Sequence, residues 1–213
     1  MKKVYFISGL GADKRVFSFL DLSFCEPIFI DWIKPLKKES LESYAIRLRS
    51  LIPEAAPTIV GISLGGMLIT EMAKFDKNAN GIIISSNKTK DEFPKYLRFA
   101  KFFPIYRWFP SKISKKIMLN FKWILGVKGK NQKRLLRQII IESDMNFVKW
   151  AIDVILNWRN DKVPDNIIHI HGTSDKLLKD RFVKANYTVK GGTHVMTINK
   201  SEEVSNILKT LLK

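Results

Sequence analysis

Residues 60–66 read Val-Gly-Ile-Ser-Leu-Gly-Gly and place one serine, Ser63, midway between two glycines. A strand-like apolar run precedes this serine and a helix-like pattern follows it. A strand that turns at once into a helix strains its central residue and brings neighbouring backbone very close, so Gly61 and Gly65 are needed there. Such a turn holds the hydroxyl above the end of the strand, at a helix N-terminus that favours negative charge. A turn that required only small residues would accept Gly or Asn at position 63. The spacing therefore predicts a nucleophilic serine.

A serine hydroxyl is a weak nucleophile at neutral pH, and it needs a general base that is itself oriented by a carboxylate. The chain has three histidines, and His194 follows the last predicted strand in the stretch Gly-Gly-Thr-His. Asp175 follows the preceding predicted strand in the stretch His-Gly-Thr-Ser-Asp. Because the carboxyl ends of parallel strands lie along one edge of a sheet, we expect Ser63, Asp175 and His194 to meet at that edge.

The elements that must position these side chains alternate between strand and helix along most of the chain. The apolar residues of the strands are continuous rather than alternating, which indicates a parallel sheet that helices cover on both faces. Helices are predicted at 40–51, after Ser63, and at 202–212. The predicted strands are 3–8, 27–33, 58–62, 82–85, 166–171 and 182–189.

Residues 87–162 depart from this alternation and predict a helical insertion between two strands of the sheet. Prolines at 94, 104 and 110 interrupt its first part. Apolar residues then recur at helical spacing over 135–140 and over 147–158, each forming one face of a helix.

These motifs together resemble the α/β-hydrolase superfamily. The order Ser63…Asp175…His194 is the order of its triad, and the helical insertion occupies the usual place of its cap. The resemblance implies an α/β fold, with a compact and mostly parallel sheet of about six strands flanked by helices. It also implies one domain over 1–213, with 87–162 as a helical cap within it. The strand with the oxyanion loop comes first, so the usual N-terminal strand pair is expected to be missing.

The resemblance also implies an oxyanion hole built from backbone N–H groups of Leu10 and Leu64. The loop that carries the first of these usually begins with His-Gly, whereas here it reads Ser8-Gly9-Leu10-Gly11. A serine leaves the backbone role intact, and the loss of one oxyanion donor typically costs ~3 kcal/mol of transition-state stabilisation. Some members carry the acid after an earlier strand, but Ser-Ser-Asn occupies 85–87 here, which favours Asp175.

The implied function is a serine hydrolase that cleaves a carboxylic ester or thioester through an acyl-enzyme. Lyase, acyltransferase and C–C hydrolase variants use the same triad and stay open, as does a non-catalytic module with a basic cap. No cofactor is expected. His169 and His171 form a His-x-His pair on one face of a strand, but no third ligand completes a metal site, so no metal is predicted. His171 is instead expected to shape the turn that presents Asp175.

The net charge of +17 is concentrated in one third of the chain. Residues 87–160 hold 17 of the 37 basic residues, 5 of the 20 acidic ones and four of the five tryptophans. A basic surface with aromatics can bind nucleic acid or an anionic membrane. A solvated lysine-rich surface over an apolar helical core explains the same composition, and we prefer that interpretation. Nucleic acid is therefore not the expected partner, although peripheral contact with an anionic membrane stays open.

The expected partner is a small hydrophobic acyl ester or thioester. The aromatic residues of the insertion either wall an apolar pocket for this substrate or join the insertion to the core. A positive field over the site would favour an anionic substrate, whose hydrolysis would fall with added salt. The longest apolar stretches are far shorter than the ~20 residues that cross a bilayer. The single cysteine, Cys25, fits a reducing compartment, so a cytoplasmic protein is expected.

Overall fold

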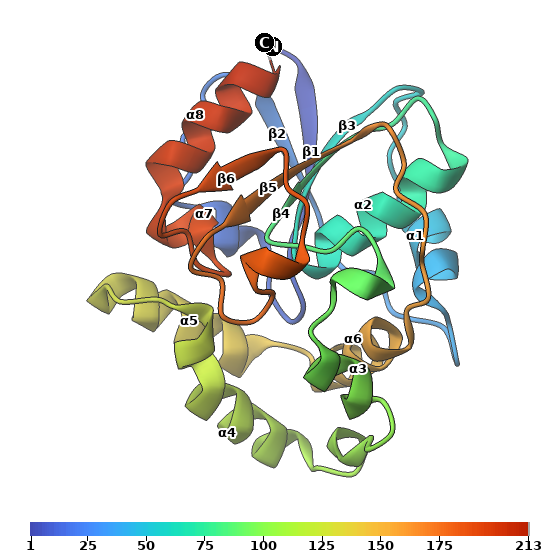
Figure 1. Cartoon of the computed structure of the whole chain (residues 1–213), viewed down its shortest axis with the longest axis vertical. Helices are drawn as coiled ribbons and strands as arrows, with labels where there is room; N and C mark the ends of the chain where they lie inside the picture. Colours follow the sequence, from blue (N-terminus) through green and yellow to red (C-terminus); the bar gives the residue numbers. More distant parts are fainter. Residues whose placement is uncertain (213) are drawn as a thin grey trace.

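The computed structural model describes residues 1–212, except for the side chains of Arg98, Ala100, Phe121 and Lys122. A six-stranded, wholly parallel sheet runs through the molecule in the order β2-β1-β3-β4-β5-β6 (Figure 1). This confirms the predicted α/β class and the number of strands. The strands are β1 (Lys3–Ile7), β2 (Glu26–Ile30), β3 (Thr58–Ile62), β4 (Asn80–Ile84), β5 (Ile167–Gly172) and β6 (Tyr187–Val189).

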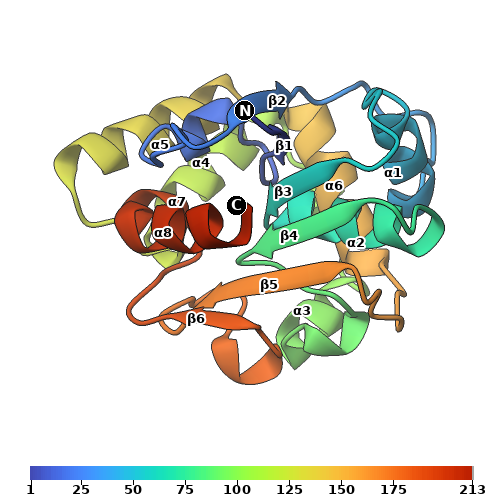
Figure 2. The same cartoon turned by 90° about the horizontal axis from the view of Figure 1, so that it is seen from above.

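Helices cover both faces of the sheet, as the continuous apolar strands predict. Figure 2 shows α1 (Leu41–Arg49) and α2 (Leu64–Phe75) on one side, with α7 (Met196–Asn199) and α8 (Ser201–Leu212) on the other. The side chain of Ser40 caps α1 by accepting the Ser43 N–H at 3.1 Å. The buried residues of α1 are Leu41, Tyr44, Ala45 and Leu48, which is the spacing of one helix face.

Four helices lie between β4 and β5 and extend beyond the edge of the sheet at which the strands end (Figure 1). They are α3 (Lys95–Ala100), α4 (Ser111–Phe121), α5 (Lys130–Glu142) and α6 (Met145–Asn157). We refer to residues 87–162 as the helical segment.

Helix α6 joins the helical segment to the core through aromatic contacts. The rings of Phe147 and Trp32 lie 4.8 Å apart between centroids, and those of Trp150 and Tyr44 lie 4.5 Å apart. The indole N–H of Trp150 also donates to the carbonyl of Glu39 at 3.0 Å. In α6, therefore, the aromatic residues hold the helix against the sheet domain, which is one of the two roles considered from the sequence.

Two strands are shorter than the sequence predicts by more than one residue. The strand expected at 27–33 ends at Ile30, because the chain turns away where the Tyr44 hydroxyl bonds both the N–H and the carbonyl of Ile33, at 3.0 and 2.9 Å. The strand expected at 182–189 pairs only over its last three residues. Asp180–Phe182 forms a 3₁₀ turn instead. The first boundary prediction was wrong because a side chain of α1 binds the backbone of Ile33. The second was wrong because the N–H groups of Phe182 and Val183 donate to carbonyls within the local turn, at 2.9 and 3.0 Å.

No helix in the part of the chain that the structure describes is long and apolar enough to cross a membrane.

Candidate active site

Ser63 lies between β3 and α2 in a strained backbone conformation, with φ 54° and ψ −115°. Positive φ is uncommon for a residue with a side chain, and strained conformations of this kind cluster at functional sites. A Cβ atom at Gly65 would lie 2.4 Å from the carbonyl oxygen of Ile7, and one at Gly61 would lie 2.6 Å from the carbonyl carbon of Gly65. Both glycines are therefore required by backbone contacts, as the sequence predicts.

The structure brings together the three side chains that the sequence selects. The hydroxyl oxygen of Ser63 lies 3.0 Å from Nε2 of His194, and Nδ1 of His194 lies 2.8 Å from Oδ2 of Asp175. His194 and Asp175 are each only 4 % exposed, whereas Ser63 is partly exposed. The imidazole can therefore accept a proton from the hydroxyl while its other nitrogen donates to the carboxylate.

The carboxylate of Asp175 is held by its own loop. Oδ1 accepts the backbone N–H groups of Leu177 and Leu178 at 2.8 and 2.9 Å, which leaves Oδ2 for His194. Burial by itself raises the pKa of this carboxyl. Attraction to the His194 ring in its charged form and the hydrogen bonds from His194 and Leu178 outweigh burial, so the pKa lies below its usual range. Asp175 is consequently ionised at neutral pH.

His169 and His171 form a buried pair behind this loop. Nε2 of His171 lies 2.7 Å from the carbonyl oxygen of Leu178, which can only accept, so this nitrogen carries the proton. Nδ1 of His171 must then accept from Nε2 of His169, 3.1 Å away. Burial lowers the pKa of His169 to about 2 and also lowers that of His171. The pair is neutral, and it ties β5 to the loop that presents Asp175.

The loop after β1 lies against Ser63, since a Cβ atom at Gly9 would be 3.3 Å from the serine Cβ. The hydroxyl of Ser8 donates to the carbonyl of Ala12 at 2.8 Å and so fastens the loop from within. Within the described residues, the backbone N–H groups of Leu10 and Leu64 donate to no acceptor. They are available to a ligand at Ser63.

Two polar residues that the sequence did not predict for the site hold its backbone by hydrogen bonds. Ser86, directly beyond β4, donates its hydroxyl to the carbonyl of Ser63 at 2.7 Å. Asn199 accepts both the N–H and the hydroxyl of Thr193, at 3.2 and 2.7 Å, and thereby holds the residue before His194. Each partner lies far away in the sequence or in another element, so no local motif marks it.

An apolar cavity of about 360 Å³ adjoins Ser63 and His194. The loop after β1 forms one side, and the helical segment contributes residues from α3, α4, α5 and α6. No Lys or Arg lines it among the residues that the structure describes. Its apolar lining includes Leu10, Met67, Leu97, Met118, Leu136, Ile140, Ile152, Ile155 and Val195.

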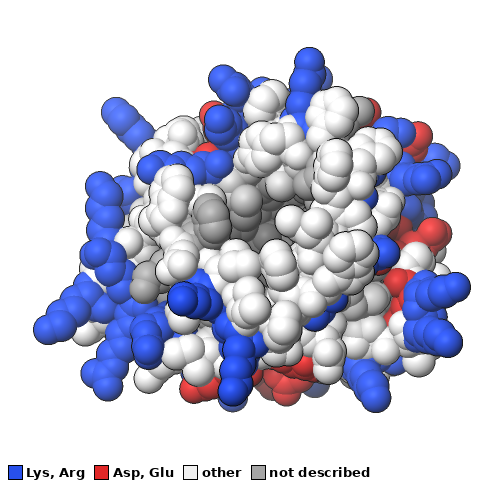
Figure 3. Space-filling model, turned by 90° about the horizontal axis from the view of Figure 1, so that it is seen from below, with Lys and Arg blue, Asp and Glu red and all other residues white. Residues whose placement is uncertain are grey.

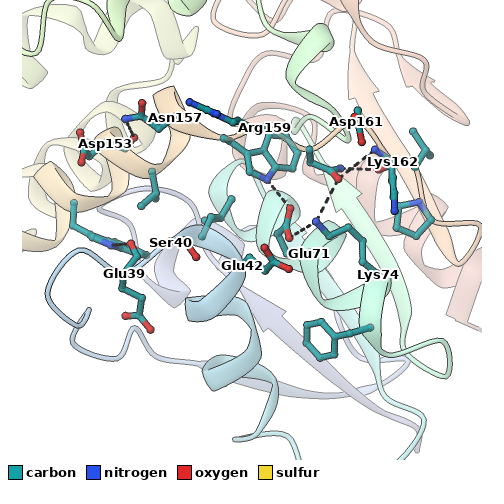
Figure 4. A pocket seen from close by; sticks show the side chains of 18 of the residues that line it. Glu39, Ser40, Glu42, Glu71, Lys74, Asp153, Asn157, Arg159, Asp161 and Lys162 are labelled. Atoms are coloured by element: carbon teal, nitrogen blue, oxygen red, sulfur yellow. Dashed lines mark hydrogen bonds and ion pairs between the residues drawn. The ribbon is translucent and has the colours of Figure 1, made fainter.

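A larger depression of about 1470 Å³ lies elsewhere, between α1, α2 and the end of α6 (Figure 4). Its lining is rich in charge and includes no residue of the Ser63 site. The buried carboxylate of Glu71 pairs with Lys74 at 2.6 Å and accepts the indole N–H of Trp158 at 2.7 Å. These contacts join α2 to the segment after α6, which is a structural role.

Within the described part of the chain, neither a metal site nor a reactive thiol is evident. It holds no group of three or more His, Cys, Asp or Glu side chains arranged to bind a metal ion. Cys25 is buried directly before β2, and burial raises the pKa of its thiol.

No family model matches the sequence, and no curated protein matches it. Solved structures match it over nearly the full length of both chains. An esterase from Thermogutta terrifontis has 13% identity and a TM-score of 0.75, over 100% of this chain and 89% of its own. A bromoperoxidase from Bacillus anthracis has 14% identity and a TM-score of 0.69, over 99% and 91%. A meta-cleavage product hydrolase from Pseudomonas fluorescens has 16% identity and a TM-score of 0.69, over 100% and 90%. At such low identity, the likeness establishes a shared fold.

Proposed function

The chain has the α/β-hydrolase fold, and on this framework we propose that it is a serine hydrolase of carboxylic esters or thioesters. One observation carries the proposal. A strained Ser63, a buried His194 and an ionised Asp175 are linked by hydrogen bonds of 3.0 and 2.8 Å beside an apolar cavity. The esterases among the solved structures of the same fold support it.

In the first half of the proposed reaction, Oγ of Ser63 attacks the carbonyl carbon of the substrate while its proton passes to Nε2 of His194. Asp175 stabilises the imidazolium that results. The carbonyl oxygen becomes an oxyanion, and the free N–H groups of Leu10 and Leu64 are assigned to it. His194 then returns the proton to the departing alkoxide or thiolate as the carbonyl reforms, which leaves the acyl group on Ser63.

In the second half, a water molecule gives a proton to His194 and attacks the acyl-enzyme. The tetrahedral intermediate uses the same two backbone donors. Its collapse breaks the bond to Oγ of Ser63, and His194 returns the proton to that oxygen. The products are a carboxylic acid and the free enzyme.

The apolar lining supports a substrate with a hydrocarbon acyl group. A cavity of about 360 Å³ lies at the small end of the range that ligand pockets occupy. A free carboxylate or phosphate inside it would lack a cationic partner among the described lining residues. An anionic leaving group, such as a phosphorylated thiol, would have to lie outside the cavity, near the basic helices.

The experiment that tests the proposal combines covalent labelling with turnover. A fluorophosphonate probe should label the wild type at Ser63, and p-nitrophenyl acetate, butyrate and octanoate should be hydrolysed. Ser63→Ala should abolish both signals, because among the described residues the hydroxyl that is hydrogen-bonded to Nε2 of His194 is that of Ser63. Ser23→Ala changes an exposed serine that precedes β2, whereas Ser63 follows the end of β3, and this variant should retain both signals.

The controls also separate the alternatives that share the fold. Labelling of Ser63 without hydrolysis of any ester would favour C–C cleavage or acyl transfer by the same residues. Absence of labelling in folded protein would contradict the serine-nucleophile mechanism and leave a binding module. With a thioester of a phosphorylated thiol as substrate, a hydrolysis rate that is independent of salt would remove the suggestion of an anionic substrate.

A further inference from the structure

Large apolar side chains are exposed on one stretch of the helical segment. Of the 18 large hydrophobic residues that are exposed in the described part of the chain, nine lie within 28 residues, from α3 to just beyond α4. Trp108 is 84 % exposed and Phe103 is 72 % exposed. Exposed apolar patches of this kind mark interaction sites in soluble domains. We call the nine residues the exposed apolar cluster: Tyr96, Phe99, Phe102, Phe103, Ile105, Trp108, Ile113, Ile117 and Trp123.

The sequence around this stretch contains basic residues and no acidic ones. The 49 residues from Phe93 to Ile141 contain 13 Lys and Arg and not one Asp or Glu. Figure 3 looks onto this side of the molecule and shows a hollow bordered by uncharged side chains. Lys and Arg predominate around the margin, with fewer Asp and Glu among them. A surface of this charge attracts an anionic partner and repels other basic surfaces.

Helix α4 shows how the apolar and basic residues are combined. Ile113 and Ile117 are exposed one turn apart, and Lys112 and Lys116 are exposed beside them, also one turn apart. Met118 of the same helix lines the cavity. The helix therefore has three different sides: an exposed apolar side, an exposed basic side, and a side that lines the cavity.

The basic margin continues onto the loop that holds Asp175. The ammonium group of Lys176 lies 5.5 Å from the centre of the Trp123 ring, and that of Lys101 lies 5.0 Å from the Phe102 ring. Cation–π contacts of this kind keep a cation next to an aromatic ring without removing either from the surface. Charge and aromatic surface are thus interleaved rather than separated.

We propose that the exposed apolar cluster and its basic margin dock on an anionic lipid surface. Aromatic and aliphatic side chains enter the boundary between headgroups and acyl chains, while neighbouring Lys and Arg contact anionic headgroups. A nucleic acid would use the cations but would leave the aliphatic residues of α4 exposed to water. A lipid surface accounts for both observations.

Docking in this orientation would bring the helices that wall the cavity against the bilayer. Leu97 of α3 and Met118 of α4 face the cavity, while Tyr96, Ile113 and Ile117 of the same helices are exposed. The acyl substrate would then enter from the lipid phase. This last step rests on the proposed function, whereas the docking itself does not.

Vesicle flotation tests the docking directly. Wild-type protein should float with vesicles of phosphatidylcholine and phosphatidylglycerol, bind pure phosphatidylcholine far more weakly, and dissociate as salt is added. The double variant Phe103→Ser/Trp108→Ser should lose binding roughly tenfold or more, because both side chains are largely exposed and can insert. Leu36→Ser/Phe75→Ser is the matched control, with two exposed apolar side chains outside the cluster, and should bind like the wild type.

Charge reversal supplies the second arm. Lys112→Glu/Lys116→Glu should also weaken binding roughly tenfold or more, whereas the exposed pair Lys77→Glu/Lys209→Glu should have a much smaller effect. Equal effects of the two pairs would mean that only net charge matters, and would overturn the assignment of the docking face. Retention of duplex DNA without flotation would assign the surface to nucleic acid instead.

The two proposals can fail separately. Ser63→Ala should float like the wild type, since docking does not use the nucleophile. Ester hydrolysis without flotation would contradict the docking surface and leave the hydrolase. Flotation without fluorophosphonate labelling would contradict the hydrolase and leave the docking surface.

Discussion

The orientation of the Asp175 carboxylate decides which nitrogen of His194 can act as a base. Oδ1 accepts two backbone N–H groups, so Oδ2 is the atom that faces Nδ1 of the imidazole. An oxygen at that place requires a proton on Nδ1, which leaves Nε2 free to accept the proton of Ser63. The loop around residue 175 therefore sets the tautomer of a side chain 19 residues away.

Asp175→Asn should keep the fold and lose the reaction. The two N–H groups from Leu177 and Leu178 will retain the amide oxygen, so the new NH₂ group faces His194 and holds the wrong tautomer. We expect kcat to fall by about 10⁴ with little change in KM. Ester hydrolysis and thermal unfolding would be measured on this variant and on Asp165→Asn, an exposed control. A small loss of kcat would contradict the assigned orientation.

The buried His169 and His171 should make the protein sensitive to acid. The unfolded chain protonates His169 below its ordinary pKa of 6.5, but the folded chain does so only near 2. The folded state is therefore favoured above pH 6.5, and that advantage is lost as the pH falls. Each such histidine contributes a slope of about 1.4 kcal/mol per pH unit to the free energy of unfolding.

His169→Leu removes one of these groups and should flatten the pH dependence. Urea unfolding of the wild type and the variant between pH ~6 and ~4 should give free energies whose difference changes by about 1.4 kcal/mol per pH unit. The variant leaves Nδ1 of His171 without its donor, so its absolute stability at neutral pH will be lower. Only the slope of the unfolding free energy against pH tests the prediction. Parallel plots for the wild type and the variant would contradict it.

At the level of elements, the turn between β3 and α2 depends on how closely three backbone segments approach. A Cβ atom at Gly65 would lie 2.4 Å from the Ile7 carbonyl oxygen and 2.5 Å from that of Ser8. These atoms belong to β1 and to the loop that carries Leu10. The glycine thus keeps the candidate nucleophile and the candidate oxyanion donors in register.

Gly65→Ala should displace that loop and lower both stability and activity. Overpacking against backbone that cannot yield is expected to cost about 3 kcal/mol in the free energy of unfolding. Gly129→Ala is the control, because its added Cβ would meet only the movable side chain of Gln132, and its cost should stay below about 1 kcal/mol. Thermal melts and the rate of fluorophosphonate labelling would report the two effects. Equal costs at both positions would show that the close approach at Gly65 is unimportant.

At the level of the whole molecule, the helical segment packs against the rest of the chain on one side and exposes apolar residues on the other. Helix α6 packs against Trp32 and Tyr44 of the sheet domain, whereas the outer sides of α3 and α4 expose apolar residues. Between them lies the cavity, which exists only because the segment covers the edge of the sheet where Ser63 emerges. Under the proposed function, its volume should limit the length of the acyl group.

Ile152→Trp should shorten the acyl chain that the cavity accepts. Ile152 lines the cavity from α6, so added bulk there takes space from the substrate. We expect kcat/KM for the octanoate ester to fall by roughly tenfold or more, with the acetate ester little changed. Ile141→Trp, at an exposed position of α5 outside the cavity, is the control. A uniform loss for all esters would contradict the assigned position of the acyl chain.

The sequence by itself determined the features that depend on neighbours along the chain. Glycines on both sides of Ser63, apolar runs with the period of a strand or a helix, and polar loops after strands predicted the sheet and selected Asp175 and His194. These signals are readable because backbone strain and one-sided burial act within a few residues. Where a distant side chain binds the backbone, as Tyr44 does at Ile33, local periodicity misplaced the end of a strand.

Only the tertiary structure decided which groups lose contact with water. It made His169 and His171 a neutral pair, gave Ser86 and Asn199 their roles beside the site, and closed an apolar cavity over Ser63. It also divided aromatic residues of similar sequence context into those that pack against the sheet and those that remain exposed. Burial is a property of the assembled chain, because each group is desolvated by segments that the sequence places far from it.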